Sequence, residues 1–226
     1  MTIQSDNYEI LAKLLKEGVT SGKLSSLTDD AQKSLVSFYE IMLKENQVQN
    51  LTRLASPNEF CDYHLADTFK LLETGWVAYP ALDLGSGAGI PGVLAALIDK
   101  KAWILAESEK RKAEYLQRAV DTLGIQGQVQ VVPDRAEAFL KAHKVGSIVV
   151  RAVGTVEKIY GWIRKCSTWN NLILLKGPNW EEEWKVFLAS PFGSELKVTG
   201  EVEYQVGPEQ KTRKIVRVER VVAVRH

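Results

Sequence analysis

A cluster of glycines follows a short apolar run near the middle of the chain. The stretch ALDLGSGAGIPG (residues 81–92) holds four of the protein's 16 glycines, with Asp83 near its start and Pro91 near its end. Because glycines lack side chains, the backbone can turn sharply there and expose N–H groups to a ligand at the start of a helix. Such a loop suits the binding of a nucleotide-containing cofactor.

The same glycines fit two classes of cofactor-binding loop. Gly87, Gly89 and Gly92 match the G-x-G-x-x-G fingerprint of dinucleotide-binding proteins, which is a weak signal when it stands alone. Asp83 lies two residues before Gly85, and this D-x-G-x-G spacing resembles the first motif of S-adenosylmethionine-dependent methyltransferases. In that class the acid holds the loop or faces the sulfonium and amino group of the cofactor, whereas it would repel a pyrophosphate. We therefore favour S-adenosylmethionine as the cofactor.

Two further segments are placed to complete such a cofactor site. Glu107 directly follows the apolar run 103–106, where an acid binds ribose hydroxyls in both classes; a surface acid near a helix start is the alternative. The segment after the next apolar run predicts a helix start with Asp134 as its N-cap. In methyltransferases this loop flanks the adenine, which makes Ala136 and Glu137 candidates for contacts with its edge.

Three cations are candidates for substrate binding. Arg151 and Lys176 each follow an apolar run, at the sheet edge where open α/β sheets bind ligands; the alternative for both is an ordinary surface cation. Arg213 belongs to the tail 210–226, which carries six basic residues against the single acid Glu219. Such a tail meets phosphate, or it forms a solvated edge strand whose charges prevent aggregation, and we favour the second interpretation.

The residues before the glycine loop have the spacing of helices. Apolar residues recur at helical intervals over 8–17, 29–45 and 56–73. We expect Gly18 to end the first of these helices as a left-handed cap, and Thr28 to cap the start of the second.

From residue 81 onward, short apolar runs alternate with amphipathic segments such as 109–123. The expected strands are 81–84, 103–106, 129–132, 147–150 and 171–175. Nearly continuous hydrophobic strands joined by helices predict a parallel sheet, and the segments 201–206 and 214 onward predict an antiparallel hairpin after it. The expected fold is α/β, a Rossmann-like class I methyltransferase sheet with a C-terminal antiparallel hairpin and an N-terminal helical layer. We expect residues 1–75 to form a helical extension packed on a methyltransferase core of residues 76–226.

The bulk composition is that of an ordinary soluble protein. The 226 residues are 45% hydrophobic and 25% charged, and no run approaches the roughly 18–20 apolar residues that a membrane span needs. The opening residues lack the pattern of a secretory signal, so we expect a cytoplasmic location. Cys61 and Cys166 stand alone, which predicts two reduced thiols in the core and no metal site. We also expect a monomer.

Several separated motifs resemble one family, the bacterial small-subunit ribosomal RNA guanine-N7 methyltransferases first named as glucose-inhibited division protein B. The matching motifs, in chain order, are NLTRL (50–54), HLADT (64–68), LDLGSGAGIPG (82–92), ESEKRKAEYLQ (107–117), VRAVG (150–154) and LLKG (174–177). The resemblance implies a methyl transfer from S-adenosylmethionine to N7 of a guanine in small-subunit (16S) ribosomal RNA. The partner would be that RNA or the small subunit. The cofactor contacts implied by motif position are Gly85, Ile90, Ala136, Glu137 and Arg151, and Gly87 and Glu107 join them from the loop and strand-end argument above.

The absence of other catalytic motifs agrees with a guanine N7 acceptor. The segment after the fourth expected strand reads RAVG, without the Pro-Pro-aromatic motif of amine methylation, and neither cysteine stands where a cytosine-C5 nucleophile would. Guanine N7 carries a free lone pair and needs no general base, so no catalytic acid or base is assigned. Arg and Lys read the neighbouring O6, which makes Arg151, Lys176 and Arg213 the substrate-binding candidates.

Some roles stay open at the level of sequence. His64 and Asp67 are three residues apart and share a helical face, either as a buried hydrogen-bond pair or as catalytic groups. Cofactor motifs do not specify the acceptor, so a methyltransferase for another RNA or a small molecule is an alternative. A noncatalytic ribosome-assembly or RNA-binding factor that keeps the fold is another.

Overall fold

The first part of the chain folds into helices, as its apolar spacing predicts. The structure, a computed structural model, describes residues 3–21, 24 and 27–221. The first helical elements are α1 (Ile3–Thr20), α2 (Asp29–Gln49), α3 (Pro57–Glu59), the π-helix η1 (Phe60–Leu65) and α4 (Ala66–Glu73). The side chain of Thr28 accepts a hydrogen bond from the Ala31 N–H and caps α2, and Ser56 and Glu59 form a capping box at α3. These caps fix where each helix begins.

Seven strands of the described residues form one sheet. They are β1 (Ala81–Leu84), β2 (Trp103–Ala106), β3 (Val129–Val132), β4 (Val145–Arg151), β5 (Trp169–Lys176), β6 (Leu196–Val206) and β7 (Lys211–Arg220). Their order is β3-β2-β1-β4-β5-β7-β6; the first five are parallel, and β7 runs antiparallel to both β5 and β6. The predicted parallel sheet with a C-terminal antiparallel hairpin is confirmed. β1, β2 and β3 have the expected bounds, whereas β4, β5 and both hairpin strands begin earlier than expected.

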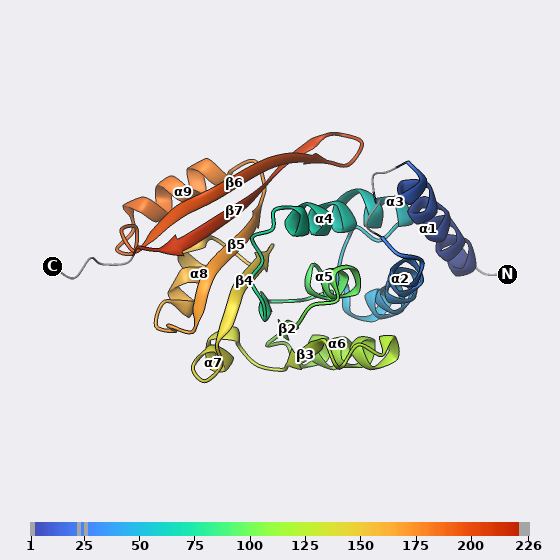
Figure 1. The fold of residues 1–226 in the computed structure, drawn as a ribbon, viewed down its shortest axis with the longest axis horizontal. Coiled ribbons are helices and arrows are strands. Elements are labelled where there is room, and N and C mark those ends of the chain that lie inside the picture. The colour runs from blue at the N-terminus through green and yellow to red at the C-terminus, as the bar shows by residue number, and fades with distance from the viewer. Residues whose placement is uncertain (1–2, 22–23, 25–26, 222–226) are drawn as a thin grey trace.

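Helices cover both faces of this sheet (Figure 1). The later helices are α5 (Gly92–Asp99), α6 (Lys110–Leu123), α7 (Ala136–Leu140), α8 (Val156–Ile163) and α9 (Trp180–Ala189). Trp103 and Leu105 of β2 pack in a cluster with α1, α2, α5 and α6, while Ile104 and Ala106 of the same strand pack with α7 and α8. Because side chains alternate along a strand, one apolar run supplies both cores.

Two expected helix caps are wrong. Gly18 does not end the first helix, because α1 continues to Thr20; its lack of a side chain instead lets Leu24 pack closely, since a Cβ there would lie 2.7 Å from the Leu24 Cδ1. Asp134 is not the N-cap of α7. That position belongs to Arg135, and the Asp134 carboxylate accepts a hydrogen bond from the Arg135 N–H at 2.6 Å.

The basic tail does not form an edge strand, which corrects the interpretation favoured from the sequence. β7 lies between β5 and β6, and β6 is the edge strand at this end of the sheet. Lys214 of β7 is buried, and its ammonium donates to Glu181 of α9 and to Glu201 of β6, the latter at 2.7 Å. Acidic residues of α9 and β6 thus neutralise the charge of Lys214. The sequence of β7 by itself had suggested an exposed strand. Arg225 lies outside the described residues.

Both cysteines are free thiols, with Cys166 buried and Cys61 partly buried against the core. Within the described ranges, no cluster of three or more His, Cys, Asp or Glu side chains is arranged to hold a metal ion. None of the helices among the same residues is long and apolar enough to cross a membrane.

Candidate active site

The glycine loop after β1 is tied to the end of β2. The Gly87 N–H donates to one carboxylate oxygen of Glu107 at 3.0 Å, and the Glu109 N–H donates to the other at 2.8 Å. Gly85 adopts a φ of +73°, and a Cβ at this residue would lie 2.8 Å from the Val153 Cγ2. The sequence therefore needs glycine at position 85 both for its backbone conformation and for the close approach of the loop after β4.

Asp83 fixes the glycine loop through a hydrogen bond to the backbone at the start of α5. Its side chain is buried at the end of β1, and its carboxylate accepts a hydrogen bond from the Gly92 N–H at 3.0 Å. Burial raises the pKa of Asp83 to about 7. Of the two roles expected for this acid, the geometry supports the first, in which the acid fixes the loop and the first turn of α5. A carboxyl group with 1% exposure is not presented to a ligand.

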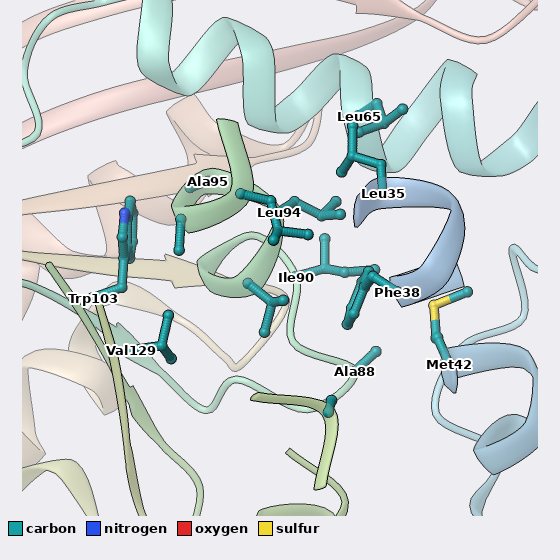
Figure 2. Packing of buried hydrophobic residues seen from close by; sticks show 14 of the residues in the cluster. Leu35, Phe38, Met42, Leu65, Ala88, Ile90, Leu94, Ala95, Trp103 and Val129 are labelled. Atoms are coloured by element: carbon teal, nitrogen blue, oxygen red, sulfur yellow. The ribbon is translucent and has the colours of Figure 1, made fainter. Parts of the chain in front are cut away.

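The side chain of Ile90 points into the hydrophobic core and away from the loop surface. Figure 2 shows it beside Phe38 of α2 and Leu94 of α5, and its exposure is 6%. Phe38 also approaches Gly89, where a Cβ would lie 3.3 Å from its ring. Ile90 therefore contacts any ligand in the loop through its backbone, and the N-terminal helical layer supports the loop directly.

A hollow lies beside Gly85 at the carboxyl ends of β1 and β2. Its lining residues are Leu84, Gly85, Ala106, Ser108, Asp134, Arg135, Ala136, Glu137, Val153 and Trp162. The structure thus brings Gly85, Ala136 and Glu137 to one place, as the sequence predicts. Sequence reasoning did not single out Val153 and Trp162, which reach the hollow from the loop after β4 and from α8; Val153 stands inside the VRAVG motif, whereas no motif marks Trp162.

A second cavity, of about 350 Å³, lies at the carboxyl ends of β4 and β5. It is lined by Asp67, Arg151, Ala152, Gly154, Leu175, Lys176, Gly177, Glu183 and Arg213. All three substrate-binding candidates meet here, because β4, β5 and β7 are neighbours in the sheet. Glu183 of α9 and Asp67 of α4 are the two carboxylates among them, and sequence reasoning did not place either one in this cavity.

The three cations of this cavity differ in their partners. The Lys176 ammonium donates to Glu183 at 2.7 Å and to the Gly154 carbonyl at 2.9 Å, so its charge is locally neutralised. Arg151 pairs with Asp67 at 3.0 Å. Arg213 forms no ion pair or hydrogen bond with the side chains that the structure describes. Its guanidinium is therefore the cavity's uncompensated positive charge within the described chain.

One short loop separates the two hollows. Residues 151–154 leave β4, and Val153 faces the hollow beside Gly85 while Ala152 and Gly154 line the cation cavity. Ala152 has a φ of +58°, a left-handed conformation that is strained for a residue with a side chain and that is concentrated at functional sites. Arg151 begins this loop and lines the cation cavity, so it stands at the border between the two hollows.

Arg151 is held by the two residues whose roles the sequence left open. Its Nε donates to Asp67 Oδ2 at 3.0 Å and its Nη2 donates to His64 Nδ1 at 2.9 Å. Arginine has no acceptor, so His64 Nδ1 must be unprotonated and Nε2 carries the ring proton, which points to the Leu54 carbonyl at 3.1 Å. Burial, together with the Arg151 charge, lowers the pKa of His64 to about 3, so the ring is neutral at pH 7.

This state of His64 predicts a pH effect on stability. Between the ordinary pKa of 6.5 and the lowered value of about 3, the unfolded chain binds a proton that the folded chain does not. The contribution of His64 to stability should therefore fall as the pH drops from 6.5, by about 2 kcal/mol at pH 5. We expect the Tm of the wild type to fall more steeply than that of His64→Asn between pH 7.5 and 5. Parallel curves would contradict the assignment; Asp83 titrates in the opposite sense but equally in both proteins.

The topology and the loop together define a class. A doubly wound parallel sheet with an antiparallel C-terminal hairpin, a D-x-G-x-G loop after β1 and an acid after β2 are the features of Rossmann-like methyltransferases. Solved structures agree on the fold. The tRNA methyltransferase TrmK of B. subtilis aligns with a TM-score of 0.51 at 17% identity, over 70% of this chain and 65% of that one. A putative RNA methyltransferase of Pyrococcus horikoshii gives 0.50 at 16% identity, over 70% and 83%.

The family within that class follows from the sequence. Residues 31–211 match the family model described as rRNA small subunit methyltransferase G, and the chain belongs to this family. Relatives named ribosomal RNA small subunit methyltransferase G include a protein of Solibacter usitatus, 35% identical over 146 residues, which are 64% of this chain and 69% of the relative. A second, from Dichelobacter nodosus, is 27% identical over 76% of this chain and 81% of the relative. The resemblance predicted from the separated motifs is confirmed.

Proposed function

We propose that this protein transfers a methyl group from S-adenosylmethionine to N7 of a guanine in small-subunit (16S) ribosomal RNA. The observation that carries the proposal is the pair of hollows on either side of residues 151–154. One is bounded by a glycine loop and by the residues expected at an adenine; the other presents three cations suited to a nucleotide. The family of the chain supports the same reaction.

The residues around the first hollow fit S-adenosylmethionine. Gly85 leaves room that a side chain would fill, since its Cβ would lie 2.8 Å from Val153. The Glu107 carboxylate accepts two backbone N–H groups, and its other lone pairs are left for the ribose hydroxyls. Ala136 and Glu137 would flank the adenine, and Gly87 and Ile90 would contribute backbone contacts. The bound cofactor supplies an electrophilic methyl group.

The second hollow is the proposed acceptor site. Lys176 and Arg151 are each paired with a carboxylate, which neutralises their charge. They therefore shape the wall of the cavity and attract an anion less strongly than an unpaired cation would. Arg213 has no such partner among the described residues, and a half-buried guanidinium can bind guanine O6 or a neighbouring phosphate. We assign Arg213 the main contact with the RNA, with Arg151 and Lys176 beside it.

Both carboxylates among the described residues that line the cavity are paired with cations. Asp67 and Glu183 each accept hydrogen bonds from a cation, and the His64 ring is neutral with both nitrogens engaged. Guanine N7 has a lone pair at neutral pH, so methyl transfer to it requires alignment of nucleophile and methyl carbon and no base. The chemistry of the site and the proposed acceptor atom agree.

Arg213→Gln tests the acceptor site. Losing one charge-assisted contact should raise the KM for RNA about tenfold, while the Kd for S-adenosylmethionine stays within twofold of the wild type. The measurement is transfer of labelled methyl to small-subunit ribosomal RNA from cells that lack this protein. Arg217→Gln is the matched control, because Arg217 lies on the same strand but pairs with Glu219. An unchanged KM in Arg213→Gln would remove Arg213 from the site.

The proposal also covers the domain organisation, the oligomeric state, the location and the metal requirement of the protein. Residues 1–75 form an extension packed on a methyltransferase core of residues 76–226, since α1 and α2 share one hydrophobic cluster with α5 and α6. The enzyme acts as a monomer in the cytoplasm, on ribosomal RNA or on the small subunit, and uses no metal. Size-exclusion chromatography with light scattering tests the monomer.

A further inference from the structure

Four side chains from distant parts of the sequence meet at Arg151. His64 lies in η1, Asp67 in α4 and Tyr204 in β6, while Arg151 ends β4. Arg151 donates to His64 and Asp67 as described, and the Tyr204 hydroxyl donates to the second oxygen of Asp67 at 2.7 Å. The helical layer and the C-terminal hairpin thus contact the same guanidinium, one directly and the other through Asp67.

We propose that His64, Asp67 and Tyr204 are positioning residues, which orient the Arg151 guanidinium between the cofactor and acceptor sites for methyl transfer. This inference rests on the proposed function. The clamp, meaning these three residues, occupies Nε and Nη2 of Arg151. Nη1 forms no hydrogen bond with residues that the structure describes, so it is left for a ligand in the cavity that Arg151 lines.

The polar atoms of His64 and Asp67 are all engaged in hydrogen bonds within the protein. Both oxygens of Asp67 are used, one by Arg151 and one by Tyr204, and its side chain is 5% exposed. Nδ1 of His64 accepts from Arg151, and Nε2 lies 3.1 Å from the Leu54 carbonyl. Asp67 is neutralised by a cation, His64 is held neutral, and guanine N7 carries no proton that must be removed, so none of the three is assigned as a general base. Orientation of Arg151 is the role that remains.

The clamp is itself anchored on both sides. On the helical side, Thr52 lies 3.3 Å from His64 Nε2, and Asn46 holds Thr52 by a pair of hydrogen bonds with its backbone at 2.8 and 3.0 Å. The NLT segment (50–52) therefore has a structural role, because its Thr52 contacts the His64 ring on the side opposite Arg151. The ring also packs edge-on against Phe60, with centroids 6.0 Å apart.

On the other side, the tip of the β6–β7 hairpin is fastened to η1. The Gly207 N–H donates to the Asp62 carbonyl at 3.2 Å, and the Tyr63 hydroxyl donates to Glu209. The Lys211 ammonium lies 5.4 Å from the centre of the Tyr63 ring. Figure 1 shows the hairpin reaching across the molecule toward α3 and α4. The hairpin thereby holds the π-helix that carries His64, and such turns are rare overall but frequent at functional sites.

The test compares pairs of variants that differ in one hydrogen bond. His64→Asn keeps an acceptor near the position of Nδ1, whereas His64→Leu fills similar space without one. We expect kcat to fall roughly tenfold in His64→Leu and to stay within about threefold of the wild type in His64→Asn, with the Kd for S-adenosylmethionine unchanged in both. Tyr204→Phe should lower kcat several-fold. Its matched control is Tyr160→Phe, which removes a hydrogen bond to Glu195 in the opposite core and should leave kcat unchanged.

A double-mutant cycle shows whether these residues act through Arg151. In an Arg151→Lys background, His64→Leu should change kcat less than twofold, because the guanidinium it orients is gone. A tenfold loss in both backgrounds, or a loss of Tm with wild-type kcat, would overturn the positioning role. If the wild type itself transfers no methyl group, the proposed function fails; if it does and both His64→Leu and Tyr204→Phe match it, only this inference fails.

Discussion

Gly85→Asp should abolish cofactor binding and methyl transfer in a chain that still folds. Residue 85 has a φ of +73°, and a Cβ there would lie 2.8 Å from Val153, so a side chain must displace the loop after β4. The added carboxylate would also place a negative charge at the hollow that Gly85 lines, where the cofactor is expected to bind. We expect calorimetry to detect no binding of S-adenosylmethionine, and circular dichroism to show the wild-type helix and strand content.

Gly127→Asp is the control for this variant. Gly127 lies in an exposed turn with open space around its Cβ position, so the same substitution adds the same charge without filling the hollow. It should bind cofactor and transfer methyl groups as the wild type does. Cofactor binding by Gly85→Asp at wild-type affinity would show that the hollow beside Gly85 is not the cofactor site.

Arg151→Ala should lower kcat/KM by about 100-fold or more, because the group between the two hollows is lost. It should also destabilise the fold. Removing the guanidinium leaves the Asp67 carboxylate buried without its cation, which typically costs about 3–5 kcal/mol. Steady-state kinetics and thermal unfolding measure the two effects separately.

Arg151→Lys separates charge from geometry. A lysine keeps a cation for Asp67, but a single ammonium does not reproduce the fork that joins Asp67 to His64. We expect it to recover most of the lost Tm and to leave kcat at least tenfold below the wild type. Full recovery of kcat by lysine would mean that the site needs only a positive charge there.

The strands of the sheet could be predicted from the sequence because each depends on a local pattern of apolar residues and turn signals. The runs ALDL, WILA and VQVV are bounded by turn or helix signals, and they became β1, β2 and β3 with the expected bounds. Gly85, Ala136 and Glu137 came together because parallel strands bring their carboxyl ends to one edge. Lys176 and Arg213 share a cavity for a related reason, since β5 and β7 are paired.

What the sequence did not reveal depends on contacts between elements. Nothing local to Arg151 indicates that it bonds His64 and Asp67 of a helical segment more than eighty positions earlier. The basic strand β7 looked like an edge because its neutralising acids Glu181 and Glu201 lie on other elements. Ile90 looked like a ligand contact by motif position, yet α2 packs beneath the loop and buries its side chain. Tertiary packing decides such cases, and the periodicity of a single segment does not report it.

The central claim is tested most directly by identifying the methylated nucleoside. Small-subunit ribosomal RNA from cells that lack this protein is incubated with the enzyme and S-adenosylmethionine carrying an isotope-labelled methyl group. The RNA is then digested to nucleosides for mass spectrometry. We predict labelled 7-methylguanosine with the wild type and none with Gly85→Asp. Label in a different nucleoside, or no label although the cofactor binds, would contradict the proposed function.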